Sequence, residues 1–292
     1  MPDDRPFARE LGDFLKARRS RLTPEAAGFA PGPRRKVAGL RREELALLAG
    51  LSTDYYQRME QGRDVRPSDD VLDALARALT LDDDERRHFF ALAHAARRPS
   101  ATRPRRTTER VPDSTRRLLH SMGCPGVVLG RHLDVLAWND LAEALLGDPR
   151  VIPPAERNML LLLFRDPETR ARCPEFESTA LDYIGMLRKA VGQDPTHPRA
   201  LAVVGELSIR SAEFRRLWAR HDVTETTHGT KLFAHPRVGM ITLDWDAYPL
   251  PGARGPVLVA YTAEPGTPDA DKLRLLADLH AAATGEGGSC IN

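Results

Sequence analysis

Cysteine is scarce in this chain of 292 residues, and its scarcity limits the kinds of site that the chain can hold. The three cysteines are Cys124, Cys173 and Cys290, an odd number without paired spacing. This pattern argues against a disulfide framework and against a cysteine-rich zinc module. We therefore expect no metal and no cofactor.

Long apolar runs are also absent. No stretch approaches roughly 18 consecutive apolar residues, the length that a membrane span requires. The first residues mix Asp, Arg and Glu with scattered apolar positions, and they lack the continuous apolar stretch of a signal peptide. The sequence therefore predicts a cytoplasmic protein with no membrane partner.

Motifs of common enzymes are missing too. The chain has no phosphate-binding glycine loop, no Gly-x-Ser-x-Gly and no His-Glu-x-x-His. His221 and Asp222 are adjacent, and neighbouring residues seldom reach the geometry of a catalytic pair. Asp244 and Asp246 share one face of an expected strand, which favours a solvated surface over a metal site. We expect no catalytic residues and no enzymatic activity.

The charges that are present divide unevenly along the chain. Residues 1–110 contain 23 Lys and Arg against 18 Asp and Glu, whereas residues 111–292 contain 20 against 23. A basic first part favours a polyanionic partner there. Residues 98–112 combine proline, small residues and many arginines, which is typical of an extended linker.

Four segments follow from these patterns: a helical domain at 1–97, the linker at 98–112, a second domain at 113–284 and a tail at 285–292. In the first domain, the spacing of apolar residues predicts an all-helical bundle with helices at 7–19, 41–49, 53–61, 69–79 and 82–96. In the second, expected strands at 126–130, 135–138, 230–235, 238–245 and 257–262 surround helices at 140–146, 155–164, 176–191, 199–209 and 212–220, with a last helix at 269–282. This order predicts an α+β domain with an antiparallel sheet.

The most specific motif runs from Glu43 to Gly62. Gly50 can end a helix in a left-handed turn, and Ser52 can cap the next helix with its hydroxyl. Tyr56 and Met59 share one helix face, which we expect to pack inward with Leu45, Leu48 and Leu51. The opposite face is polar, so the motif has one buried and one hydrogen-bonding side.

This motif resembles the helix-turn-helix of the phage-repressor-like XRE family, over about residues 7–96. In that family the second helix enters the major groove of double-stranded DNA. The resemblance implies base contacts from Thr53, Asp54, Gln57 and Arg58 and phosphate contacts from Arg41, Arg42, Arg63 and Arg66. Asp54 can instead orient Arg58 four residues later, and the basic loop Arg34-Arg35-Lys36 is either a DNA arm or a solvated loop.

The second domain contains a series of distinctive short segments, which include Val128-Leu129-Gly130-Arg131, Leu136-Ala137-Trp138-Asn139, Glu156-Arg157-Asn158, Gly205-Glu206-Leu207-Ser208, Gly229-Thr230-Lys231 and Tyr261-Thr262-Ala263-Glu264-Pro265-Gly266. In these segments, and in their order along the chain, the domain resembles the MmyB-like ligand-binding domain. The resemblance implies a PAS-like sheet covered by helices, a bound fatty acid as effector, and a transcription regulator with an N-terminal DNA-binding domain.

An apolar ligand needs an apolar wall and a polar group for its head. Apolar helix faces in the second domain supply wall candidates, and two side chains that flank the helix at 212–220 can donate to a carboxylate. These candidate ligand residues are Trp138, Leu160, Phe164, Met186 and Trp218 for the wall, and Arg210 and His221 for the head group. Each assignment has an alternative. The apolar residues can form a filled core, Arg210 can be a solvated surface charge, and His221 can interact only with the C-terminal end of its helix.

Together these features predict a transcription regulator that binds an operator, senses a small apolar ligand such as a fatty acid or an acyl-type molecule, and pairs as a homodimer on two half-sites. Two alternatives stay open at this point. One is a DNA-tethered protein-interaction module without a ligand, and the other is an enzyme on the second domain.

Overall fold

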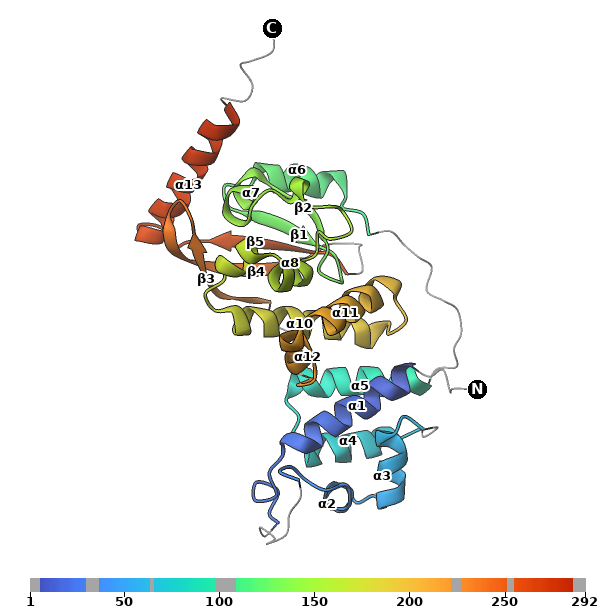
Figure 1. Cartoon of the computed structure of the whole chain (residues 1–292). Helices are drawn as coiled ribbons and strands as arrows, with labels where there is room; N and C mark the ends of the chain where they lie inside the picture. Colours follow the sequence, from blue (N-terminus) through green and yellow to red (C-terminus); the bar gives the residue numbers. More distant parts are fainter. Residues whose placement is uncertain are drawn as a thin grey trace. The chain divides into compact units, whose positions relative to one another are not determined.

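The computed structural model describes residues 6–29, 37–63, 66–97, 109–221, 227–250 and 255–285. The basic cluster Arg34-Arg35-Lys36 and most of the expected linker lie outside the described residues. The chain forms two compact units (Figure 1). One comprises residues 1–105 and 188–225, and the other comprises residues 106–187 and 226–292.

The first unit is helical in its described part. It contains five helices from the start of the chain: α1 (Pro6–Arg21), α2 (Arg42–Leu48), α3 (Thr53–Glu60), α4 (Asp69–Ala78) and α5 (Asp83–Arg97). It also contains the end of α10 (Phe176–Gln193), α11 (Pro198–Arg210) and α12 (Ala212–Trp218). The all-helical bundle that the sequence predicts for the first domain is confirmed.

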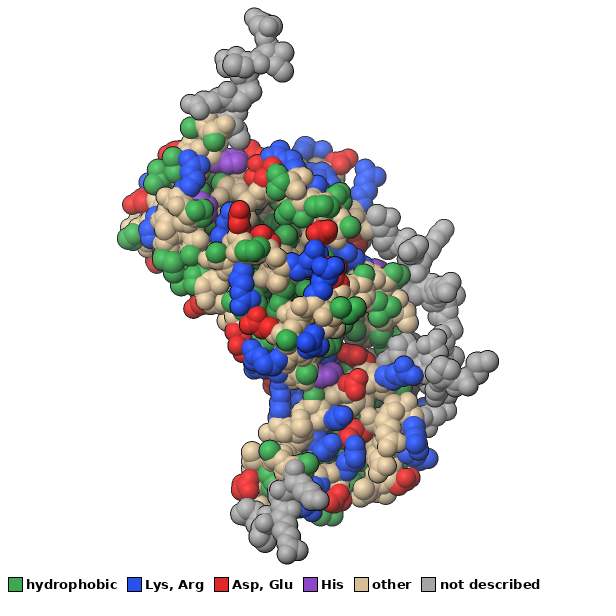
Figure 2. Space-filling model, viewed as in Figure 1, with side chains coloured by type: hydrophobic (Ala, Val, Ile, Leu, Met, Phe, Trp, Pro, Cys, Tyr) green, Lys and Arg blue, Asp and Glu red, His purple; other side chains and the backbone are tan. Residues whose placement is uncertain are grey.

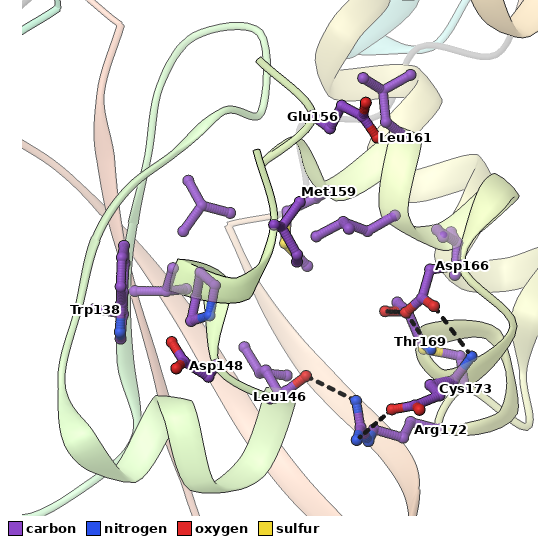
Figure 3. A pocket seen from close by; sticks show the side chains of 18 of the residues that line it. Trp138, Leu146, Asp148, Glu156, Met159, Leu161, Asp166, Thr169, Arg172 and Cys173 are labelled. Carbon is purple, nitrogen blue, oxygen red and sulfur yellow. Dashed lines mark hydrogen bonds and ion pairs between the residues drawn. The ribbon is translucent and has the colours of Figure 1, made fainter. Parts of the chain in front are cut away.

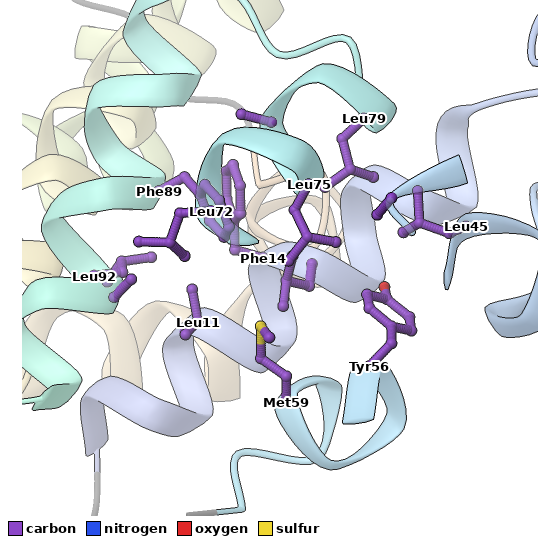
Figure 4. Packing of buried hydrophobic residues seen from close by; sticks show 14 of the residues in the cluster. Leu11, Phe14, Leu45, Tyr56, Met59, Leu72, Leu75, Leu79, Phe89 and Leu92 are labelled. Carbon is purple, nitrogen blue, oxygen red and sulfur yellow. The ribbon is translucent and has the colours of Figure 1, made fainter. Parts of the chain in front are cut away.

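A single apolar core holds α1 to α5 together (Figure 4). Phe14 of α1 stacks on Phe89 of α5, with ring centroids 5.8 Å apart. Leu72 and Leu75 of α4 and Met59 of α3 point into the same core, and all are essentially buried. Helix-spaced apolar residues in each segment thus produce one shared interior.

The second unit is built on a five-stranded antiparallel sheet with the strand order β2-β1-β5-β4-β3. The strands are β1 (Gly126–Leu129), β2 (Val135–Trp138), β3 (His228–His235), β4 (Gly239–Pro249) and β5 (Val257–Thr262). One face of this sheet packs through Val128, Ala137 and Leu258 on Leu119. Because side chains alternate along a strand, Val127, Trp138 and Phe233 belong to the opposite face. This architecture agrees with the predicted α+β, PAS-like class.

Helices surround the sheet of the second unit. They are α6 (Asp113–Ser121), α7 (Asp140–Leu146), α8 (Met159–Arg165), α9 (Pro167–Ala171), the first part of α10, and α13 (Pro268–Gly285), with a short 3-10 helix at Pro149–Val151. Asn139 caps α7 as the sequence suggests, since its side chain accepts from the backbone N–H of Ala142 at 2.9 Å. None of the described helices is both long and apolar enough to cross a membrane.

The structure adds elements that the sequence patterns did not predict. Helix α6 presents only Leu119 to the core, whereas the neighbouring Leu118 is 55% exposed, so its apolar periodicity is weak. Helix α9 spans five residues, too few to show a period. Leu48, expected to pack inward, is exposed at the end of α2.

Candidate DNA-binding face and ligand cavity

The helix-turn-helix geometry depends on two residues between α2 and α3. Gly50 adopts a φ of 66°, the left-handed conformation that a glycine reaches without strain. The Ser52 hydroxyl accepts a hydrogen bond from the backbone N–H of Tyr55 at 3.2 Å and so caps α3. Both roles agree with those expected from the sequence.

Helix α3 has one buried and one exposed face. Tyr56 and Met59 are buried in the core, whereas Thr53, Asp54, Gln57 and Arg58 are all exposed. The guanidinium Nε of Arg58 lies 3.5 Å from an Asp54 carboxylate oxygen, so Asp54 can orient Arg58 along the helix surface. The exposed face therefore carries donors and acceptors that a major groove can accommodate.

The end of α3 lies against α1 at a close backbone approach. A Cβ at Gly12 of α1 would lie 2.5 Å from the carbonyl oxygen of Glu60. Any larger residue at this position would have to move one of the two helices. The approach fixes α3, and with it the exposed polar face, on the rest of the bundle.

Four arginines around α2 and α3 differ in their surroundings. Arg41, Arg63 and Arg66 are exposed. Arg42 instead donates from Nε to the Glu60 carboxylate at 2.9 Å, although its side chain is still 42% exposed. On the face shown in Figure 2, basic and acidic side chains are interspersed.

Glu60 forms the centre of this charged group. Its side chain is 1% exposed and accepts from Arg19 Nε at 2.8 Å as well as from Arg42. Burial alone would raise the pKa of Glu60, but the hydrogen bonds that it accepts and the charge of Arg19 together lower the pKa. Glu60 is therefore a buried carboxylate that stays ionised and ties α3 to α1.

The second unit contains a cavity of about 550 Å³ between the sheet and helices α7 and α8 (Figure 3). Its walls are mainly apolar and come from β1, β2, α7, α8, α10 and β3 and from the segment around Ile152. Trp138 and Met159 both lie at this cavity, and the Trp138 indole N–H donates to Glu143 at 3.3 Å. In Figure 2, hydrophobic side chains gather around α7 and α8.

One basic side chain projects from the sheet at this cavity. Lys231 of β3 donates from Nζ to the Tyr183 hydroxyl at 3.0 Å and lies 4.7 Å from the centre of the Tyr183 ring. Its Nζ is also 5.6 Å from the centre of the Phe233 ring. Burial raises the pKa of both Tyr183 and Tyr261. These contacts place a cation next to aromatic faces in an apolar site.

Other polar groups lie near the ends of α8 and α9. Arg172 donates from Nη1 to the carbonyl oxygen of Leu146 at 3.0 Å, and Asp166 caps α9 through the backbone N–H of Thr169 at 2.9 Å. Cys173 is buried, and burial raises the pKa of its thiol. Among the described residues, no group of three or more His, Cys, Asp or Glu could hold a metal ion.

The residues expected at a ligand site are only partly brought together. Trp138 lines the cavity. Leu160 is completely buried, Phe164 packs on Phe176 at 5.2 Å between ring centroids, and neither they nor Met186 belong to the cavity lining. The last three, Arg210, Trp218 and His221, belong to the first unit.

Sequence patterns did not single out Lys231 or Tyr183 as cavity residues. Lys231 belongs to Gly229-Thr230-Lys231, one of the segments on which the family resemblance rests, and it precedes Phe233 by two positions along β3. The strand period of two could therefore have placed both side chains on one face. Tyr183 has no comparable signal, because a long helix offers several apolar residues on its buried side.

Comparison with family models matches the two parts of the chain separately. Residues 111–276, more than half of the chain, match the ligand-binding domain of MmyB-like transcription regulators. The chain belongs to the MmyB-like transcription regulator family. Residues 10–89 of this MmyB-like regulator match a helix-turn-helix domain. No curated protein matches the chain.

The two matches define the function at a coarse level. The helix-turn-helix domain indicates DNA as a partner, and the MmyB-like domain indicates a small-molecule ligand. The chain is thus a ligand-responsive transcription regulator. In this MmyB-like regulator, helix α3 with its exposed polar face lies within the helix-turn-helix match. The cavity lies within the match to the ligand-binding domain.

Proposed function

We propose that this MmyB-like regulator binds specific DNA sequences and responds to a fatty acid or a related acyl compound. The observation that carries the ligand class is the cavity of about 550 Å³ with its apolar walls. Ligand sites in proteins have volumes of this size and place a few polar groups in a mainly apolar wall. A cavity favours a sensor over an interaction module with a filled core.

Lys231 is the proposed partner of the ligand's anionic head group. Its ammonium group has three donors, and the contacts with Tyr183, described above, use one of them. The aromatic faces of Tyr183 and Phe233 hold the ammonium group in place without neutralising it. A carboxylate beside Lys231 would form a charge-assisted hydrogen bond in an apolar setting.

The test is thermal unfolding of the delipidated protein with dodecanoic acid, hexadecanoic acid and the uncharged 1-dodecanol. A ligand that binds only the folded state stabilises it by about 2.7 kcal/mol at a hundredfold excess over Kd. We expect both acids to stabilise the wild type. Lys231→Met should lose most of the response to the acids and keep the response to the alcohol.

Two variants serve as controls for Lys231→Met. Lys272→Met removes a lysine of α13 that contacts Asp269 at 3.1 Å and should leave both responses unchanged. Arg210→Ala removes an exposed arginine of the first unit, and loss of the acid response there would assign the head group to Arg210 instead. No response of the wild type to any of the three compounds would reject the proposed ligand class.

We also propose that the regulator acts as a homodimer. The eight residues of α3 can reach only a few base pairs, and helix-turn-helix domains read two half-sites about one helical turn apart. Light scattering should give twice the mass of the chain, at least when the protein is bound to its DNA site. A monomer both free and on DNA would contradict this proposal.

A further inference from the structure

Arg188, near the end of α10, is completely buried in the first unit. Its Nη1 contacts His221 Nδ1 at 2.8 Å and the Glu10 carboxylate at 3.3 Å, and its Nη2 donates to the carbonyl oxygen of Trp218. The guanidinium also lies 4.0 Å from the centre of the Trp218 ring. A buried guanidinium is stable only when partners of this kind compensate for the water that it loses.

The carboxylate partner comes from a different part of the sequence. Glu10 belongs to α1, 178 positions before Arg188. Burial raises the pKa of Glu10, and the charge of Arg188 opposes that rise. The two charges therefore stabilise each other, because removal of either one takes a countercharge away from its buried partner.

Two further contacts join the same parts of the chain. Arg18 of α1 donates to the carbonyl oxygen of His221 at 2.6 Å and forms an ion pair with Glu85 of α5. His88 of α5 lies so close to α10 that a Cβ at Gly192 would be 2.6 Å from the imidazole Cε1. Helices α1 and α5 thus contact residues 188–221 at three separate points.

These contacts connect segments that belong to different family domains. Glu10, Arg18 and His88 lie within the helix-turn-helix match, and residues 188–221 lie within the MmyB-like ligand-binding match. We propose that Glu10 and Arg188 form a latch through which residues 188–221 of the ligand-binding domain hold the DNA-binding helices α1 and α5. The latched residues unfold and open as one cooperative unit.

The latch gives the ligand-binding domain a direct hold on the DNA-binding helices. Helix α10 runs without interruption from Tyr183, which lines the cavity, to Arg188. A buried charge pair is either formed or broken, since intermediate separations leave both charges without water and without each other. Such a pair suits a switch between two discrete arrangements.

The test is hydrogen exchange of the full chain without any ligand or DNA, so its outcome is independent of the proposed fatty acid. Wild type is compared with Glu10→Gln, Arg188→Met and the double variant Glu10→Gln/Arg188→Met. In Arg188→Met we expect amides of α1 and α5, as well as those of α12, to exchange at least about tenfold faster. The double variant should exchange no faster than Arg188→Met, because the single substitution already removes the ion pair between Glu10 and Arg188.

The matched control is Arg210→Met, which removes an exposed arginine of α11 and should change no helix except α11 itself. If Arg188→Met does not fold, the same comparison is made with Glu10→Gln, because this substitution conserves the size of the side chain and removes only its charge. Faster exchange confined to α10 and α12, with α1 and α5 at wild-type rates, would overturn the latch. Additive effects of the two substitutions would overturn the pairing of Glu10 with Arg188.

Discussion

Among single residues, Arg42 shows why exposure alone does not define a DNA contact. It is partly exposed beside the recognition helix, yet it hydrogen bonds to the buried Glu60. Replacing Arg42 would remove a countercharge of Glu60 and lower the stability of the bundle. Arg63 is exposed, so its substitution reports on phosphate contacts with less disturbance of the fold.

Arg58→Ala should weaken binding to the preferred DNA site by about 1–3 kcal/mol and relax base preference at one position. Arg63→Ala should weaken all sequences similarly and reduce the salt dependence by about one ion released. Selection from random duplexes, followed by titrations at several salt concentrations, measures both effects. Equal losses of specific and non-specific binding in Arg58→Ala would contradict its role as a base reader.

The sequence predicted which residues of α3 are exposed better than it predicted the cavity residues. The helical period of about 3.6 residues determines which side of α3 is exposed. The exposure of Thr53 and Arg58 could therefore be predicted from local spacing alone. The cavity brings together β3 and α10, which lie about fifty residues apart along the chain. No local sequence pattern predicts this contact between β3 and α10. For the same reason, Trp218 and His221 were predicted to lie at the ligand site, whereas they belong to the first unit.

At the scale of an element, α8 depends on one buried polar residue. Asn158 is completely buried and accepts from the backbone N–H of Leu160 at 3.1 Å. Its amide nitrogen donates to the carbonyl oxygen of His132 at 2.6 Å and to Asp134 at 3.0 Å. The side chain thus caps the helix that forms part of the cavity wall and joins it to the turn before β2.

Asn158→Ala should lower the free energy of unfolding by about 3 kcal/mol, because it removes a cap and leaves a buried carbonyl without its donor. Ser68→Ala removes the exposed cap of α4, whose hydroxyl accepts from Val71 N–H at 3.4 Å, and should cost about 1 kcal/mol. Urea unfolding measures both. Similar losses in the free energy of unfolding in the two variants would contradict an additional stabilising role of the buried Asn158 beyond capping.

The elements themselves were largely predictable where a period was long enough to be detected. Helix α7 begins and ends where the sequence suggested, at Asp140 and Leu146. Strand β4 continues to Pro249, past the expected end at residue 245, because its pairing with β5 extends to Val257. Tertiary pairing, rather than local alternation, decides where that strand ends.

For the whole molecule, two buried histidines predict how stability depends on pH. Burial, together with the charges of Arg188 and Arg18, lowers the pKa of His88 to about 3 and of His221 to about 2. Between these values and the ordinary histidine pKa, the unfolded chain binds protons that the folded chain does not. Stability therefore rises with pH in this range and is lost as the pH falls.

His88 should account for a loss of about 2 kcal/mol in the free energy of unfolding between pH 7 and pH 5. His88→Gln is neutral at both values, so its loss over the same interval should be smaller by that amount. Urea unfolding at the two pH values gives the comparison. The raised pKa of Glu10 acts in the opposite direction and is common to both proteins. An equal pH dependence in both would contradict the assignment to His88.

Helix α10 passes from one compact unit to the other between Leu187 and Arg188. A cut at residues 98–112 would separate α1 and α5 from residues that contact them, such as Gly192 beside His88 and His221 beside Arg18. A transplanted sensor would in turn carry Arg188 without Glu10. Successful exchange of either half of this regulator therefore requires the new half to supply a partner at these positions.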